Sequence, residues 1–202
     1  VLRADFPLVV RLFGSDEFDR IIGVPYLEFA PPRHWSLNNI CDRFMAWVTQ
    51  YYEAQDKKLV MICAQLDIWY HELFLIKHLP ALQLDKNNPV EKLLDLPITL
   101  QTSVRLCALS GHFLNFRKEM IAESIEYWQT HDFPILAKDR IYYFILCRSS
   151  SLQVVWEEIC REEYLLLDFL KDKQTIALAC DAIEEMEDVD ISMIERHIST
   201  WI

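Results

Sequence analysis

The sequence predicts an α+β fold, in which an N-terminal helical bundle precedes a smaller domain made of a short antiparallel sheet and three helices. Three observations lead to this prediction. Apolar residues before position 80 recur at helical steps of three or four, proline and asparagine gather between Leu79 and Leu100, and β-branched and aromatic runs follow. The expected organisation is a helical domain over 1–80, a linker over 81–99 and an α+β domain over 100–202.

Three helices are expected in the bundle. Ser15 is a candidate N-cap for the first, and Pro25 should kink that helix because proline lacks a backbone donor. The second helix should begin after Ser36. The third should run from about Lys58 to Lys77, with apolar residues along one face. Three such helices joined by short turns can pack as a small bundle.

The second domain should begin with a strand meander. Ile141–Cys147 is β-branched and aromatic, and the residues from Leu152 to Trp156 partly alternate, so both segments are typical of strands. Ser149–Ser151 is the expected turn between them. The predicted strands cover 100–109, 140–148 and 152–156, and the predicted helices cover about 117–129, 162–170, 175–186 and 191–201, with Thr175 and Asp190 as caps. This layout is like that of a winged helix-turn-helix domain.

Charge and hydropathy argue against several functional classes. The 20 Lys and Arg against 31 Asp and Glu give a net charge of −11, and no run of basic residues suggests a stripe for phosphates. Nucleic-acid binding is therefore unfavourable. The sequence shows no secretory signal and no apolar run long enough to cross a bilayer. We therefore expect a cytoplasmic protein that does not associate with membranes.

No catalytic, metal or cofactor site is predicted. The six cysteines form no CxxC pair and have no zinc-finger spacing, so they are expected to be small, mostly buried thiols in a reducing compartment. His71-Glu72 resembles the start of a zinc-protease motif, but the next histidine is His78, at the wrong spacing. Both histidines are expected at the surface or at the edge of the core. No glycine-rich phosphate loop is present.

A strand edge is the most informative candidate site. If the strand Leu152–Trp156 lies at the edge of the sheet, its backbone groups can pair with an extended peptide. A groove between that edge and the helix 175–186 would then hold side chains. The predicted peptide-binding residues are Leu152, Gln153, Val154, Val155 and Trp156 on the strand, and Ile176, Ala179, Cys180 and Ile183 on the helix. The alternative is an edge that is covered or too short to bind.

Several motifs give the chain a family resemblance. The first is the order Phe6-Pro7, Leu12, Gly14, Phe18, Tyr26, Pro31-Pro32 and Ser36-Leu37. The second is the segment from Leu93 to Gln101, and the third is the run Tyr143–Arg148 followed by Trp156 and Glu163–Leu170. In these motifs the chain resembles the HvfC/BufC-type partner proteins, which are related to MbnC. Pro25 departs from the family pattern, which commonly has an unbroken helix there.

The resemblance implies a function without catalysis. Proteins of this family are partners of multinuclear non-haem iron enzymes that oxidise cysteines in ribosomally made precursor peptides, and many of the products bind copper. By this resemblance, the C-terminal half would take the precursor's leader as an added strand, and the N-terminal helices would help to dock the enzyme. The iron ligands would belong to the enzyme and not to this chain.

Two rival functions remain open at the level of sequence. The family has also been labelled a DNA-binding domain, so the chain could be a winged-helix transcriptional regulator that places the helix 175–186 in the major groove. That helix has no Arg or Lys and carries three acidic residues, which is poor chemistry for DNA. The other rival is a structural adaptor in a different assembly.

Overall fold

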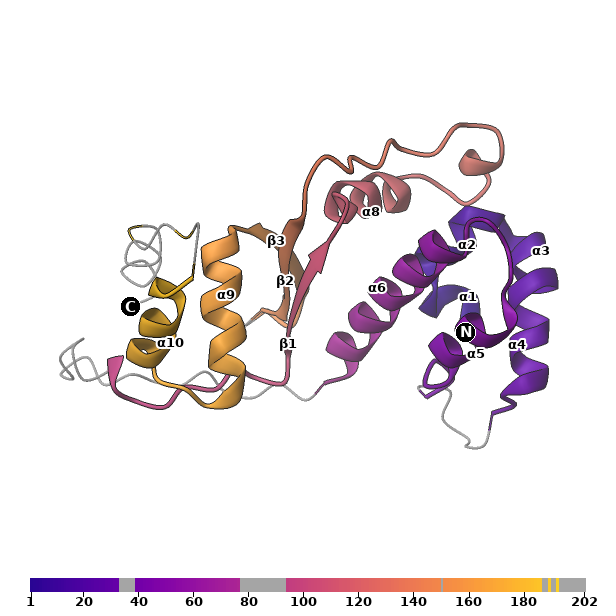
Figure 1. The fold of residues 1–202 in the computed structure, drawn as a ribbon. Coiled ribbons are helices and arrows are strands. Elements are labelled where there is room, and N and C mark those ends of the chain that lie inside the picture. Colours follow the sequence, from indigo (N-terminus) through magenta and orange to yellow (C-terminus); the bar gives the residue numbers. More distant parts are fainter. Residues whose placement is uncertain (33–38, 77–93, 150, 187–188, 190–191, 193–202) are drawn as a thin grey trace. The chain divides into compact units, whose positions relative to one another are not determined.

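The computed structural model describes residues 1–32, 39–76, 94–149, 151–186, 189 and 192. It combines helices with a three-stranded antiparallel sheet, which confirms the α+β class (Figure 1). The chain divides into two compact units. The first unit comprises Val1–Glu72 and His112–Ala137, and the second comprises Leu73–Gly111 and Lys138–Ile202.

The first unit is helical. Its elements are α1 (Leu2–Asp5), α2 (Pro7–Phe13), α3 (Ser15–Phe18), the π-helical turn η1 (Asp19–Gly23), α4 (Val24–Phe29), α5 (Phe44–Tyr51), most of α6 (Lys57–Leu75), α8 (Phe113–Ala122) and the 3-10 turn η2 (Tyr127–Gln129). Aromatic rings form the centre of its core. Phe6 stacks on Phe44 with ring centroids 3.9 Å apart, and Tyr26 meets Phe44 edge-on at 5.0 Å. All three residues are almost completely buried.

The first predicted helix is broken, as Pro25 suggested, but its start differs from the prediction. Pro25 lies in the first turn of α4, directly after the wide turn η1, where its missing N–H costs least. Ser15 makes no capping hydrogen bond, because the N-cap position of α3 is one residue earlier, at Gly14. Gly14 has φ 79°, in the left-handed region, and a Cβ there would lie 2.4 Å from Gln129 Nε2.

The segment 112–137 belongs to the helical unit and not to the α+β unit. Buried Phe113, Phe116 and Met120 lie on α8, which packs on α2. The helix predicted over 117–129 therefore begins earlier and ends at Ala122. After it, the chain folds back so that the Trp128 indole donates to the Met120 carbonyl at 3.0 Å. The observed division thus differs from the ranges 1–80, 81–99 and 100–202, since burying α8 needs the N-terminal helices.

The second unit contains the sheet. Strands β1 (Val104–Leu109), β2 (Tyr142–Arg148) and β3 (Val154–Ile159) pair in that order, and both pairs are antiparallel. Two helices and a 3-10 turn follow: α9 (Arg161–Phe169), η3 (Leu170–Asp172) and α10 (Ile176–Glu184). The three strands and these two helices lie close to their predicted positions. The predicted helix 191–201 and its cap Asp190 lie outside the described residues, apart from Ser192.

Side chains on both faces of β2 make contacts within this unit. On one face, the Tyr143 ring lies 5.0 Å from the Tyr164 ring of α9. On the other face, Arg148 donates to the Ile76 carbonyl just after α6. Helix α10 packs on α9 and not directly on the sheet, so α9 lies between them (Figure 1). The core between α9 and α10 contains Leu166, Leu170, Ile176, Ala179 and Ile183.

Candidate functional site

Strand β3 is an edge strand, with β2 as its one partner in the described part of the chain. The turn before β3 closes with the Ser149 N–H donating to the Gln153 carbonyl at 2.8 Å. Antiparallel pairs alternate between hydrogen-bonded and non-bonded positions. From this closure, Val155 directs its backbone groups toward β2, whereas Val154 and Trp156 direct theirs away from it. These two residues form the candidate pairing edge.

The predicted residues Leu152 and Gln153 belong to the turn and not to the strand. Leu152 has φ 63° and a side chain that is 48% exposed, and its N–H donates to the Ser149 carbonyl at 2.9 Å. The Gln153 N–H donates to Ser149 Oγ at 3.2 Å. Their backbone groups therefore close the hairpin and do not extend the edge.

Trp156 anchors the edge strand to the sheet. Its ring meets that of Phe144 edge-on, with centroids 5.7 Å apart, and Phe144 is completely buried. The Trp156 indole N–H is itself buried and has no hydrogen-bond partner among the described residues. Leaving such a donor unsatisfied costs about 1–3 kcal/mol. The side chain of Trp156 thus holds the strand, while its backbone faces outward.

Three of the four predicted residues on α10 are core residues and cannot line an open groove. Ile176 is 6% exposed, and Ala179 and Ile183 are fully buried against Leu166 and Leu170. Cys180 is partly buried against the same cluster. The helical periodicity located the apolar face of α10 correctly. It could not show that this face turns toward α9 instead of toward the strand edge.

A hollow of about 550 Å³ lies where β3 runs into α9. Its lining combines aliphatic and aromatic side chains with charged ones: Arg140, Ile141, Tyr142, Tyr143, Glu158, Ile159, Cys160, Arg161 and Glu162. Ile141 is 49% exposed. This hollow, and not the predicted groove beside α10, adjoins the end of β3.

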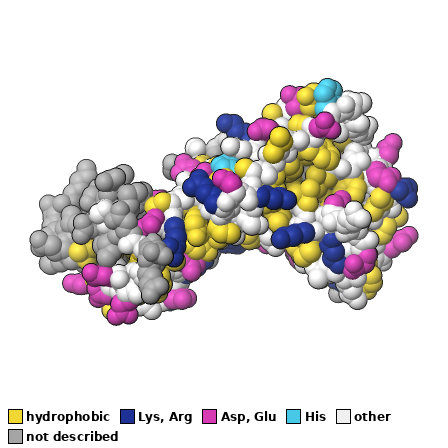
Figure 2. Space-filling model, turned by 45° about the horizontal axis from the view of Figure 1, so that its top comes forward, with side chains coloured by type: hydrophobic (Ala, Val, Ile, Leu, Met, Phe, Trp, Pro, Cys, Tyr) yellow, Lys and Arg dark blue, Asp and Glu magenta, His cyan; other side chains and the backbone are white. Residues whose placement is uncertain are grey.

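An aromatic groove of about 610 Å³ lies in the first unit, between α4 and the end of α5. Phe29, Trp47, Tyr51 and Tyr52 line it, together with the acidic residues Glu28 and Glu53 and three smaller apolar residues. Tyr51 is 50% exposed, and its ring lies 5.1 Å from that of Phe29. Hydrophobic side chains also gather over this unit on the face seen in Figure 2.

Asp67 is a buried carboxylate that the sequence analysis missed. It lies on α6 and is 1% exposed. Its Oδ2 accepts hydrogen bonds from the N–H groups of Leu8 at 2.9 Å and Val9 at 3.3 Å, in the first turn of α2. Phe6 precedes that turn without a side-chain cap. Asp67 therefore caps α2 from a distant part of the chain.

Burial dominates the titration of Asp67 and raises its pKa to about 8. Arg117, the two backbone hydrogen bonds and Arg11 act in the opposite direction and keep the pKa from rising further. Asp67 Oδ1 has no hydrogen-bond partner among the described residues. The spacing of Asp67 from the buried residues Val60, Cys63 and Ala64 on α6 is helical, and this was the available sequence signal.

A second polar cluster joins Asp5, Cys41 and His71. The Cys41 thiol donates to Asp5 Oδ2 at 3.7 Å, and His71 Nδ1 lies 3.5 Å from Asp5 Oδ1. The side chains of Asp5 and His71 are 11% and 19% exposed, and Cys41 is 5% exposed. His71 thus lies at the edge of the core, as predicted. The grouping itself was invisible in sequence because the three residues come from separate segments.

The six cysteines agree in part with the expectation of small, mostly buried thiols. None of the six, which all lie in the described part of the chain, forms a disulfide; three, including Cys41, are buried, whereas Cys147, Cys160 and Cys180 are half-buried. Burial raises the pKa of the Cys41 thiol, and the carboxylates of Asp5, Asp42 and Asp67 raise it further. Burial also raises the pKa of the Cys107 thiol to about 12. These thiols are protonated at neutral pH in the absence of a cation.

Comparisons with known proteins leave the family open. No protein-family model matches the chain, and no curated protein matches it. None of the helices in the described part of the chain combines the length and apolar character needed to cross a membrane.

Proposed function

We propose that this chain is a non-catalytic partner protein that binds the leader of a precursor peptide and presents it to an iron-dependent enzyme. The observation that carries the proposal is the edge strand β3, with the backbone groups of Val154 and Trp156 directed away from β2. An extended peptide can add to such an edge as a further strand. The resemblance to HvfC/BufC-type proteins gives the class of peptide, which contains cysteine, and the class of enzyme.

Side-chain recognition would come from the hollow at the end of β3. Main-chain hydrogen bonds give affinity with little sequence preference, so specificity needs a pocket for alternate side chains. Ile141 and Ile159 offer apolar surface there, whereas the charged lining is balanced, since Arg140 is paired with Glu158 at 3.1 Å. We therefore expect the leader to place an aliphatic residue in this hollow.

The enzyme would dock on the helical unit. The groove lined by Phe29, Trp47 and Tyr51 supports this assignment because aromatic side chains dominate the energetics of many protein interfaces. Holding both partners on one chain raises the effective concentration of the substrate at the enzyme. The presentation function needs no catalytic group on this chain.

The test is fluorescence anisotropy with a labelled leader peptide from the precursor encoded beside this gene, with and without the neighbouring iron enzyme. In Val154→Pro, an outward-facing donor is lost, so peptide affinity should fall at least tenfold while the fold is kept. Ala108→Pro is the matched control. By the same alternation, Ala108 directs its backbone away from β2 at the opposite, β1 edge of the sheet.

Val155→Pro separates folding from binding. Val155 directs its N–H toward β2, so its replacement should destabilise the sheet itself. Unchanged affinity in a folded Val154→Pro protein would refute strand addition at β3. Loss of affinity in Ala108→Pro alone would move the site to β1.

The winged-helix regulator remains the second candidate, and the same assay with duplex DNA tests it. The sheet followed by α9 and α10 favours that layout. However, Ile176, Ala179 and Ile183 bury one face of α10, and the helix has no basic residue for phosphates. DNA binding that weakens steeply with salt would establish the regulator instead.

A further inference from the structure

Three potential metal ligands meet inside the helical unit. Asp5 ends α1, Cys41 lies in the turn before α5, and His71 lies near the end of α6. One ligand atom from each lies within 4.8 Å of the other two. A carboxylate, a thiol and an imidazole in one small cluster supply the oxygen, sulfur and nitrogen donors that zinc accepts.

The spacing of the donors approaches that of a tetrahedral ion. With metal–ligand distances of about 2.0–2.3 Å, two ligands of a tetrahedral zinc lie about 3.3–3.8 Å apart. His71 Nδ1 lies 3.5 Å from Asp5 Oδ1, and Cys41 Sγ lies 3.7 Å from the other carboxylate oxygen, Asp5 Oδ2. Because one donor atom from each residue lies within 4.8 Å of the other two, the side chains must close by at most about 1 Å to bind one ion.

The neighbouring residues hold this arrangement in place. The Tyr26 hydroxyl donates to the Ile40 carbonyl and so fixes the residue before Cys41. Asp67 precedes His71 by one helical turn on α6, is almost fully buried, and interacts electrostatically with the Cys41 thiol. Its Oδ1 has no hydrogen-bond partner among the described residues and offers a further oxygen near the cluster.

We propose that Asp5, Cys41 and His71 form a binding site for Zn²⁺ or a similar borderline-soft divalent cation. Binding replaces the thiol proton of Cys41, which passes to solvent, and leaves the thiolate bound to the metal. Three protein ligands leave the fourth position of a tetrahedron for water or for a group from a partner. The ion ties α1 to a turn 36 residues away and to α6.

The experiment uses the full chain after treatment with a chelator. Co²⁺ is added first, because a thiolate bound to tetrahedral Co²⁺ gives a charge-transfer absorption band; Zn²⁺ is then titrated to displace it. We expect one equivalent to bind and Zn²⁺ to raise the thermal midpoint, whereas Mg²⁺ should do neither. Cys41→Ser should abolish the charge-transfer band.

Matched variants make the assignment specific. Mutating a residue that only hydrogen-bonds to a metal ligand typically weakens metal binding by roughly 10–100-fold. His71→Ala and Asp5→Asn each remove a ligand and should weaken Zn²⁺ binding by at least as much. Cys147→Ser in β2 and exposed His131→Ala serve as controls and should bind as the unmodified protein does. Circular dichroism verifies that each variant folds. If Cys41→Ser or His71→Ala unfolds, Asp5→Asn is the variant that tests the site. No uptake by the unmodified chain, or uptake unchanged in Cys41→Ser and His71→Ala, would overturn the proposal.

Discussion

Helix α2 of the first unit begins in a different way from α9 and α10 of the second unit. In the second unit, α10 is capped by Thr175 Oγ1, which accepts from the Leu178 N–H at 3.1 Å, and α9 by Cys160 Sγ, which accepts from the Glu163 N–H at 3.3 Å. Each of these caps is three residues from its donor. In the first unit, α8 also has a local cap, His112 Nδ1, which accepts from the Asn115 N–H at 3.2 Å, but α2 is capped by Asp67, 59 residues from Leu8.

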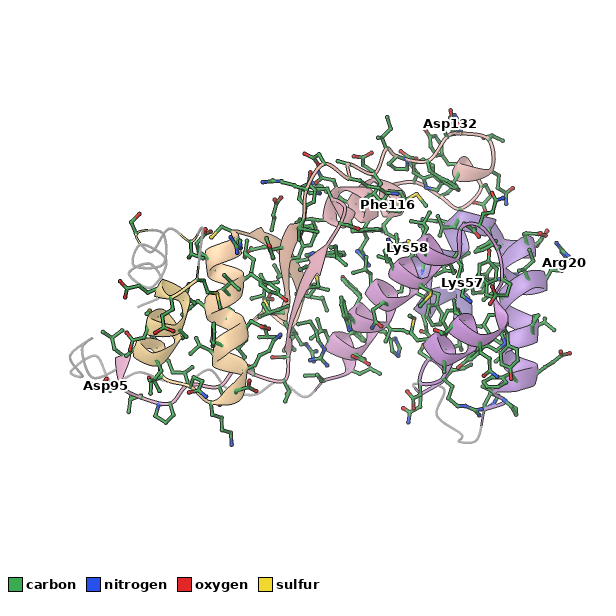
Figure 3. All side chains as sticks on the ribbon, in the orientation of Figure 1. Arg20, Lys57, Lys58, Asp95, Phe116 and Asp132 are labelled. Carbon is green, nitrogen blue, oxygen red and sulfur yellow. The ribbon has the colours of Figure 1, made fainter. Side chains whose placement is uncertain are left out.

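This difference separates local from tertiary stabilisation. A cap three residues away acts as soon as the helix forms, whereas Asp67 acts only after α6 has packed on α2. Charged side chains at the surface add little to either unit. For example, Arg20 points away from the helices in Figure 3, and its ion pair with Glu17 is exposed. The first unit should therefore depend more strongly on a single polar side chain.

The largest expected effect comes from removing the distant cap. Asp67→Ala leaves the buried N–H groups of Leu8 and Val9 without an acceptor, at about 1–3 kcal/mol each. We expect a loss of about 4 kcal/mol in the free energy of unfolding of the first unit. Urea denaturation combined with hydrogen exchange of the α2 amides measures this loss in the free energy of unfolding. A loss below about 1 kcal/mol would mean that α2 does not depend on Asp67.

The next effect tests the apolar core of the second unit. Ile183→Ala should cost about 3 kcal/mol because Ile183 is fully buried and a cavity would remain. Leu178→Ala, on the exposed face of the same helix, is the control and should change stability little, since that side chain is 56% exposed. Hydrogen exchange in α9 and α10 reports both variants. Equal effects would show that α10 does not pack as described.

The pH dependence of stability tests the role of Asp67 in a second way. The pKa of Asp67 is about 8 when folded and about 4 when unfolded, so between these values the folded state binds more protons. The stability of the first unit should therefore fall as pH rises through this window, by up to about 1.4 kcal/mol per pH unit, and level off above about pH 8.

The control for that series is Asp67→Asn, which keeps an acceptor but does not titrate. Its stability should be nearly independent of pH over the same window. The exposed carboxylates of Glu17 and Asp19 should not contribute to this pH dependence, because their arginine partners lower the pKa of each below the usual range. A pH dependence equal to that of the unmodified chain would assign the titration to another group.

The smallest expected effect is the loss of a local cap. Thr175→Ala should cost about 1 kcal/mol, because water can still reach the Leu178 N–H at the exposed start of α10. Thr175→Ser retains the hydroxyl oxygen and should recover most of the loss. Thermal denaturation followed by circular dichroism is sufficient. A cost for Thr175→Ala as large as that for Asp67→Ala would contradict the distinction between local and distant caps.

Local patterns in the sequence predicted much of the second unit. Ile141–Cys147 is β-branched and aromatic and forms β2, and Thr175 caps α10 as expected, because strand propensity and capping act within a few residues. The break at Pro25 is equally local. The sequence left the strand order open, and the edge position of β3 follows from the observed order β1-β2-β3.

Local patterns were thus enough to predict the α+β class and the positions of the three strands and the two helices after them. Which residues meet depends on packing between distant segments. It turned Ile176, Ala179 and Ile183 toward α9, returned α8 to the helical unit, and brought Asp67 to α2. It also joined Asp5, Cys41 and His71. The reason is physical: periodicity shows that a face is apolar, but the partner of that face is chosen by packing between segments far apart in the chain.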